Sequence, residues 1–535
     1  MPLPTTSPRR LPIALAATAL LLLGTAAIPF ARAADEIDQN DPAVRREERG
    51  TGKMSQKDLI RIRIAELESG AINDAMRGPE SVVLTGPPLT PREKTIHVLN
   101  RLSFGWRPGE IDRIEKAGGW EAWVKQQLAP DQIDDAKLDA LVVKRYPYLQ
   151  RTMLDLSGQF PRGEANTLRR DFRELVLLRA VNSNRQFKEV MCEFWRNHFC
   201  IDTPDNDETA RAYTAPDYEE RVIRGHAFGN FKQMLFASAT HPAMLEYLDN
   251  FRSRADNWNE NYAREVMELH TLGADRFYNE NDVLELSKIL TGWTYDKSYR
   301  FQFLDDWHQP GVKNWLGLSI KQGYAGGEQA LYTLATHRGT AEFIAFKLCR
   351  YLVNDNPPAA LVKKVAAVFL ASNGDLPQTY AAILNSPEFM TRSNYRAKFK
   401  TPFEFAACAL RTTDAAIEDG KATVDVLAKM GQPLYNCKDP TGYYDQAEAW
   451  RDAGVLTSRW DYAWKLLRND VPGVTVSTDF VKSYEGLQGK QLHDRLIDTL
   501  VGADVGTRTL GVLRKTTDVP EMISILMGSP SYQQQ

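Results

Sequence analysis

The stretch FKEVMCEFWRNHFCI, residues 187–201, shows the pattern that decides the fold. Its apolar side chains recur at intervals of three and four residues, which is the spacing of one face of an α-helix. When successive residues are placed about 100° apart, the polar side chains gather on one stripe. That stripe consists of Glu189, Glu193, Arg196, Asn197 and Cys200. The stretch therefore predicts an amphipathic helix that packs inside a helical protein.

The same helical period continues on both sides of this stretch, from about residue 91 to the C-terminus. It is clear in YAREVMELHTL (262–272), DVLELSKILTGW (282–293) and GTAEFIAFKLCRYLV (339–353). Gly, Pro, Asn and Asp interrupt these runs where helices would begin and end. The fold class predicted from this pattern is mostly α.

One segment departs from the helical period. In YRFQF, residues 299–303, apolar and polar side chains alternate as in a β-strand, and the following LDDWHQPGVKNWLG contains a Pro-Gly turn signal. We therefore expect a large multi-helix domain over residues 92–535 with a small inserted β-hairpin near 299–317. Residues 92–295 and 320–535 would then form sub-units on either side of the hairpin.

The N-terminus has the features of an export signal. Arg9 and Arg10 precede an apolar run over residues 11–30, and Ala31-Arg32-Ala33 supplies a signal-peptidase site. We predict a signal peptide at 1–33, export to the periplasm or the medium, and no integral membrane domain after cleavage. An uncleaved membrane anchor is the alternative. The charged residues 34–91, interrupted by Pro and Gly, are expected to form a flexible tether.

The composition limits the functional classes. The chain has 535 residues, with 66 Lys and Arg against 69 Asp and Glu and a formal net charge of −3. This balance gives no electrostatic basis for binding nucleic acid, and we expect none to bind. The five cysteines form no CxxC motif and no zinc-type spacing with histidine. An odd number in an exported chain leaves at least one thiol free or paired between chains, and the pairing of the others stays open.

Two acidic residues of the predicted helix 259–272 are candidates for acid–base chemistry. Glu265 and Glu268 lie on nearby positions of one helix face, and Glu265 falls among apolar neighbours. A buried carboxylate requires a cation, a proton or a metal, because an isolated buried charge is costly. A salt bridge to Arg264 or Arg196 is the alternative.

His198 lies on the apolar side of the helix that opened this section. A buried imidazole there can serve as a base or a ligand, and the alternative is a core histidine bonded to a backbone carbonyl. We therefore take Glu265, Glu268 and His198 as candidate catalytic residues.

The predicted hairpin supplies a third group, Asp306 and His308, with Trp307 between them. Loop carboxylates beside a histidine can bind a divalent cation or act as an acid–base pair, and a tryptophan can stack on a sugar ring. Solvated loop side chains without a function are the alternative. The candidate ligands for a divalent metal are Glu265, Glu268, Asp306 and His308.

Several longer motifs follow one another along the chain and carry a family resemblance. They are RLSFGWRPGEIDRIEKAGGWEAWVKQQL, FWRNHF, NENYAREVMELHTLG, DVLELSKILTGW, His308-x-x-Gly311-x-Lys313, THRGTAEFIAFKLCRYLV, SPEF and GQPLYNCKDPTGYYDQAEAW. From about Leu99 to its C-terminus, the chain resembles the bacterial domain of unknown function 1800 family. The resemblance implies a large, exported, mostly helical protein, and suggests a neighbouring gene for an exported protein with a sulfatase-like fold. It implies no reaction and no site residues.

Two functional hypotheses follow from these observations. The first, which we favour, is an exported enzyme with a buried Glu/His site between helices and a divalent metal as a candidate cofactor. The second is a non-catalytic assembly factor that binds an extracellular glycan or an exported partner protein through Trp- and Tyr-rich loops. A convergent cleft would favour the first, whereas a broad exposed aromatic surface with carboxylates paired to arginines would favour the second.

Overall fold

The computed structural model describes residues 86–160, 165–205, 210–274 and 276–535. The predicted signal peptide (1–33) and most of the predicted tether (34–91) lie outside the described residues. The structure is 60% helical, and its sheets, within the described residues, have two strands each. The mostly α fold with small β-hairpins is confirmed.

The first half of the described chain consists of helices joined by short connections. The α-helices are α5 (Pro91–Leu102), α6 (Glu110–Lys116), α7 (Gly119–Gln127), α8 (Ala136–Arg145), α9 (Met153–Gln159), α10 (Asn166–Asn182), α11 (Gln186–His198), α12 (Arg211–Tyr218), α13 (Phe231–Ala239), α14 (Pro242–Tyr247), α15 (Glu260–Glu268) and α16 (Glu280–Ile289). A π-helical segment, η3 (Glu219–Arg224), continues α12. The single-turn 3₁₀ helices are η1 (Pro130–Gln132), η2 (Pro147–Gln150) and η4 (Asn250–Arg252).

The segment between α16 and α17 contains two antiparallel hairpins where the sequence predicted one. The strands are β1 (Trp293–Tyr295) with β2 (Phe301–Phe303), then η5 (Asp305–Trp307), then β3 (Lys313–Trp315) with β4 (Leu318–Ile320). Gly292 marks the change from helix to strand, with φ at 81°. A Cβ at this position would lie 2.6 Å from the carbonyl oxygen of Leu304, so the turn requires glycine.

Helices again make up most of the second half. They are α17 (Tyr324–Thr336), α18 (Arg338–Leu352), α19 (Ala359–Ala371), α20 (Leu376–Leu384), α21 (Pro402–Thr412), α22 (Lys421–Lys429), η6 (Ala447–Trp450), α23 (Ala453–Leu466), α24 (Thr478–Lys482), α25 (Gly489–Leu500), α26 (Gly506–Leu513), α27 (Val519–Met527) and α28 (Pro530–Gln533). A third small sheet pairs β5 (Ala416–Ile417) with β6 (Val474–Thr475).

The sequence signals for helix starts are visible as caps. The Thr90 and Thr401 side chains accept from the backbone N–H of Glu93 and Glu404, and each glutamate returns a bond to its threonine's N–H. Each threonine is followed by proline, whose fixed φ suits the first helical position. These capping boxes fix the starts of α5 and α21.

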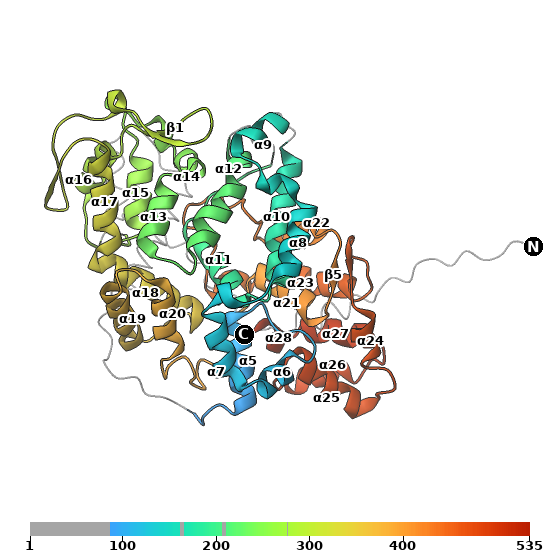
Figure 1. The fold of residues 1–535 in the computed structure, drawn as a ribbon. Coiled ribbons are helices and arrows are strands. Elements are labelled where there is room, and N and C mark those ends of the chain that lie inside the picture. The colour runs from blue at the N-terminus through green and yellow to red at the C-terminus, as the bar shows by residue number, and fades with distance from the viewer. Residues whose placement is uncertain (1–85, 161–164, 206–209, 275) are drawn as a thin grey trace, which may run out of the picture.

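Figure 1 shows how the two ends of the described chain meet. Helices α5–α7, in blue, lie beside the red helices α25–α28, and α11 lies near the centre. Arg92 of α5 binds Asp498 of α25 at 3.0 Å, and the Trp106 indole donates to the Thr499 carbonyl at 2.8 Å. The largest apolar cluster extends from Val98 to Tyr532, so residues 92–295 and 320–535 share one core. Among the described residues there is no helix with the length and apolar character that a bilayer crossing requires.

Candidate functional site

The polar stripe of α11 faces a buried network of charges. Glu189 accepts two bonds from Arg224, at 2.7 and 2.8 Å. Arg196 donates to both oxygens of Glu219, at 2.9 and 3.1 Å, and also contacts Glu193. Glu219 and Arg224 both come from the π-helical segment η3, a conformation that is rare and recurrent at functional sites. The stripe therefore packs against a second charged element and not against solvent.

A segment far along the chain, residues 431–444, closes over this network. The Gln432 amide donates to Glu193 at 3.4 Å, and the Tyr435 hydroxyl donates to Glu219 at 2.5 Å. The Asn197 side chain exchanges two bonds with the backbone of Tyr443, at 2.6 and 2.7 Å. These bonds bring the FWRNHF and GQPLYNCKDPTGYY motifs, more than 200 residues apart, into one place.

Gly442 makes the approach of the two segments feasible. Its φ is 76°, a conformation that favours glycine. A Cβ here would lie 2.4 Å from the backbone carbonyl oxygen of Asn197, too close for any side chain. Glycine is therefore required at position 442 both by the positive φ and by the close approach of the Asn197 carbonyl oxygen.

Between the two segments lies a small cleft. It is lined by Glu193, Arg196, Asn197, Cys200, Ile201, Gln432, Leu434, Tyr435, Cys437 and Tyr443. Its free volume of about 20 Å³ is room for about one water molecule. Asn197 and Tyr443 are half-buried at its edge, so the cleft reaches the surface beside them.

The electrostatics of the cleft separate its two central carboxyl groups. Burial raises the pKa of the Glu193 carboxyl to about 7, and the nearby Glu404 and Glu219 charges reinforce this rise against the opposing Arg196 charge. Burial also acts to raise the pKa of Glu219, but the Arg196 guanidinium outweighs it and the pKa lies below its ordinary value. The Arg196 guanidinium is shared by both carboxylates, but it makes two hydrogen bonds with Glu219 and stabilises that charge more. Glu193 is therefore the carboxyl that can gain or lose a proton near neutral pH.

A match to a protein family covers most of the chain. The family described as "Protein of unknown function (DUF1800)" matches residues 97–534. The chain belongs to the DUF1800 family. No curated protein and no solved structure matches it. Both motifs that form the cleft lie within the DUF1800 match, which confirms the resemblance seen in the sequence.

His198 of the DUF1800 motif FWRNHF lies on the opposite side of α11 from the cleft. Its ring is 2% exposed and packs against Phe194, Trp195 and Phe199. The Nε2 atom lies 3.2 Å from the carbonyl oxygen of His270. Burial holds the pKa of His198 well below its ordinary value, with the Lys347 charge adding to the effect. The imidazole is therefore neutral and bonded to a backbone carbonyl, the arrangement of a core histidine.

Glu265 and Glu268 lie on α15, in the DUF1800 motif NENYAREVMELHTLG. Glu265, expected among apolar neighbours, is fully buried, and Glu268 is half-buried. Arg264 binds Glu280 at 2.7 and 3.0 Å, and its pKa is raised by this contact and also by the nearby Glu268 charge, while Arg196 belongs to the α11 network. Neither glutamate lines the cleft between α11 and residues 431–444.

His308 holds the two hairpins together. Its Nδ1 lies 3.0 Å from the Thr291 carbonyl oxygen, and its Nε2 accepts the Gly323 N–H at 2.9 Å. The Lys313 ammonium lies 3.2 Å from the same Nε2, which explains the His308-x-x-Gly311-x-Lys313 motif as a structural unit. Both ring nitrogens are thus engaged within the chain, while Asp306 is exposed in η5.

The structure does not gather the four candidate metal ligands. Within the described residues, no group of three or more His, Cys, Asp or Glu side chains is arranged to hold a metal ion. Glu265, Glu268, Asp306 and His308 therefore form no shared site there.

The sequence pattern places Glu193 on the polar stripe of α11 but does not distinguish it as a catalytic residue. The sequence feature that points to this site is the stripe itself, because five polar side chains on one face of a buried helix need partners.

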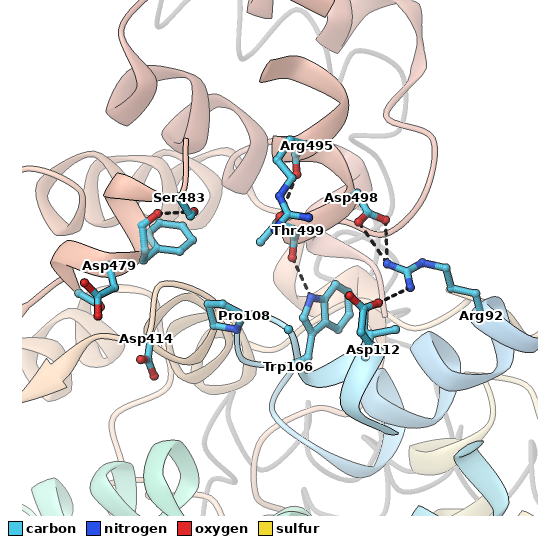
Figure 2. Close-up of a pocket in the computed structure, with 14 residues that line it drawn as sticks. Arg92, Trp106, Pro108, Asp112, Asp414, Asp479, Ser483, Arg495, Asp498 and Thr499 are labelled. Carbon is cyan, nitrogen blue, oxygen red and sulfur yellow. Dashed lines mark hydrogen bonds and ion pairs between the residues drawn. The ribbon is translucent and has the colours of Figure 1, made fainter. Parts of the chain in front are cut away.

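A larger cleft lies between the N-terminal and C-terminal helices (Figure 2). Its volume is about 180 Å³, and the labelled lining residues include Arg92, Trp106, Asp112, Asp479 and Asp498. Figure 2 shows Arg92 reaching from α5 to Asp112 of α6 and Asp498 of α25. The ion-paired groups Arg92, Asp112 and Asp498 are partly exposed, whereas the ion pairs beside α11 are buried.

Proposed function

We propose that this DUF1800 protein is an exported enzyme in which Glu193 transfers protons as a general acid–base. The observation that carries the proposal is a carboxyl group with a pKa of about 7 in a cleft built by two distant family motifs. A titratable group in a cleft whose pKa is shifted by burial and a specific charged neighbour is a functional-site candidate. The sequence predicted a buried site with Glu265, Glu268 and His198, whereas this proposal assigns the proton transfer to Glu193.

The neighbours of Glu193 suit a hydrolytic reaction. A carboxyl group whose pKa is close to the working pH can take a proton from water and return it to a leaving group. The cleft has room for about one water molecule at this carboxyl. Arg196 and the Gln432 amide both contact the Glu193 carboxyl and would hold it in position to act on that water.

The titration of Glu193 can be measured without a substrate. The carboxylic acid C=O band in infrared difference spectra is expected to titrate with a midpoint near pH 7 and to be missing from Glu193→Gln. Glu189→Gln is the matched control, because Glu189 lies on the same stripe but the Arg224 guanidinium outweighs burial and lowers its pKa. A Glu193 midpoint below about pH 5 would remove the acid–base group and with it the proposal.

Activity is the second test. Exported protein would be screened on chromogenic esters, phosphate esters and glycosides, and Glu193→Gln is expected to lower any turnover by about 10²–10⁴-fold. A turnover unchanged in folded Glu193→Gln protein would place the chemistry elsewhere. Recovery of the protein in the periplasm or the medium, with residues 1–33 removed, would test the export on which the proposal depends.

A glycan-binding role is the second candidate, and one groove favours it. An open groove of about 490 Å³ is lined by Asp249, Arg252, Asn257, Trp258, Asn259 and Glu260. Trp258 is 36% exposed, and amide and carboxylate groups beside an open indole are the chemistry that binds sugars. Trp258→Ala should abolish retention on a glycan array, while Tyr332→Ala, which removes another exposed aromatic side chain, should not.

A further inference from the structure

The end of α11 and the segment 431–444 are held side by side by backbone contacts. The Thr203 N–H and hydroxyl both bond the Tyr435 carbonyl oxygen, at 2.6 and 2.9 Å. The Tyr247 hydroxyl bonds the Cys437 carbonyl oxygen at 3.4 Å, and the Cys200 sulfur lies 3.9 Å from that same oxygen. The positions of Cys200 and Cys437 are therefore fixed relative to each other.

The two cysteine side chains lie together at the cleft. Both line it beside Glu193, and the two thiols shift each other's pKa in opposite directions, that of Cys200 upward and that of Cys437 downward. Cys200 is 5% exposed and Cys437 is 9% exposed. The other cysteines have different surroundings: Cys192 contacts Arg224, and Cys408 contacts the Thr412 hydroxyl.

We propose that Cys200 and Cys437 form a disulfide bond that fastens the segment 431–444 to the end of α11. The bond would link two positions 237 residues apart and leave Cys192, Cys349 and Cys408 as thiols, in keeping with the odd number of cysteines. Its role would be to fix the wall of the cleft that carries Gln432 and Tyr435. This inference goes beyond the proposed acid–base activity and rests only on the proposed export.

The oxidant is a protein or small-molecule disulfide, a class that acts on exported proteins. The Cys437 thiolate attacks one sulfur of the donor, which forms a mixed disulfide and releases the first donor thiol. The Cys200 sulfur then loses its proton and attacks the Cys437 sulfur, which releases the second donor thiol. Two protein thiols are oxidised, one donor disulfide is reduced to two thiols, and the two protons go to the departing thiolates. Cys437 attacks first because the neighbouring Cys200 thiol lowers its pKa.

Peptide mapping tests the bond with oxidised glutathione as the donor. After denaturation and alkylation without reductant, trypsin is expected to yield peptide 197–211 linked to peptide 430–438. Only the three other cysteines should carry the alkyl group. Cys200→Ser and Cys437→Ser should lose the link, and the matched control Cys349→Ser should keep it. Alkylation of all five thiols before reduction, or a link between any other pair, would overturn the proposal.

A thermal measurement gives a second readout on the folded protein. Reduction is expected to lower the midpoint of unfolding by about 2–4 °C in the parent protein, because the crosslink restricts a long loop of the unfolded chain. In Cys437→Ser the same reduction should leave the midpoint unchanged. An equal response of the two proteins to the reductant would contradict the bond.

Discussion

The cleft beside α11 and the larger cleft between α5 and α25 use the same kinds of residue and differ in burial. In the first, Arg196 and its two glutamates are almost completely buried, and the guanidinium is shared between carboxylates with opposite pKa shifts. In the second, Arg92 contacts three acids, Asp112, Glu115 and Asp498, but its side chain is 38% exposed and theirs are 56%, 34% and 47% exposed. Water screens the charges of the second group but not those of the first. Only in the buried cluster does the sharing of one guanidinium by two carboxylates leave one of them, Glu193, with a raised pKa.

The largest effect is expected from removing the shared cation. Arg196→Ala leaves Glu219 and Glu193 buried without their guanidinium, and breaking a buried pair in this way typically costs about 3–5 kcal/mol. Urea denaturation should show this loss at pH 7. A loss of unfolding free energy below about 1 kcal/mol would mean that these ion pairs contribute no more than solvent-exposed pairs do. Arg196→Lys serves as the partial restoration, because one ammonium cannot reproduce both contacts with Glu219.

The pH dependence of stability should come next in size. The folded pKa of Glu193 lies at about 7, above the ordinary glutamate value of about 4.5, so the folded state binds the extra proton between those values. Its contribution to stability is full below pH 4.5 and is lost as the pH rises through 7. Relative to Glu193→Gln, the parent protein should therefore lose about 3 kcal/mol over this range, at about 1.4 kcal/mol per pKa unit. Denaturation curves of both proteins at several pH values measure the difference, and a constant difference would contradict it.

The close approach at Gly442 gives a smaller effect with a matched control. Gly442→Ala adds both backbone strain and a collision with the Asn197 carbonyl, with an expected loss of about 2–4 kcal/mol. Gly317→Ala adds only the strain, because Gly317 has a similar φ of 73° and open space around it. The difference between the two variants in thermal denaturation isolates the contact. Equal losses would show that segment 431–444 can move away from α11.

The sequence predicted the helices well because a helix is specified by neighbouring residues. The 3.6-residue period of α11 and the Thr-Pro-x-Glu start of α21 are local signals, and both appear in the structure. The hairpin region was predicted in place but as one hairpin, since the first strand, β1, begins directly after Gly292, whose close approach to the Leu304 carbonyl oxygen no local pattern reveals.

The candidate site was only partly predictable for the same reason. The stripe with Glu193 was visible, but its meaning depends on Glu219 and on segment 431–444, which are brought to it by the fold. His198 and His308 were candidates because histidine is often catalytic. In the structure, aromatic rings surround His198, and both ring nitrogens of His308 are hydrogen-bonded within the chain. Burial and partners decide which polar residue carries chemistry, and periodicity indicates only the burial.

The smallest effect is expected in the larger cleft, and it completes the comparison. Arg92→Ala removes contacts with Asp112, Glu115 and Asp498, yet exposed ion pairs contribute about 0–1 kcal/mol because water already solvates the charges. What remains should fall further when the ionic strength is raised from about 0.1 to 1 M, which shortens the screening length from about 10 to 3 Å. The loss caused by Arg196→Ala should persist at both ionic strengths, since salt does not enter a buried network. Urea denaturation of the two variants at both salt concentrations measures this directly, and an Arg92→Ala loss as large and as salt-resistant as that of Arg196→Ala would show that burial is not what separates the two clefts.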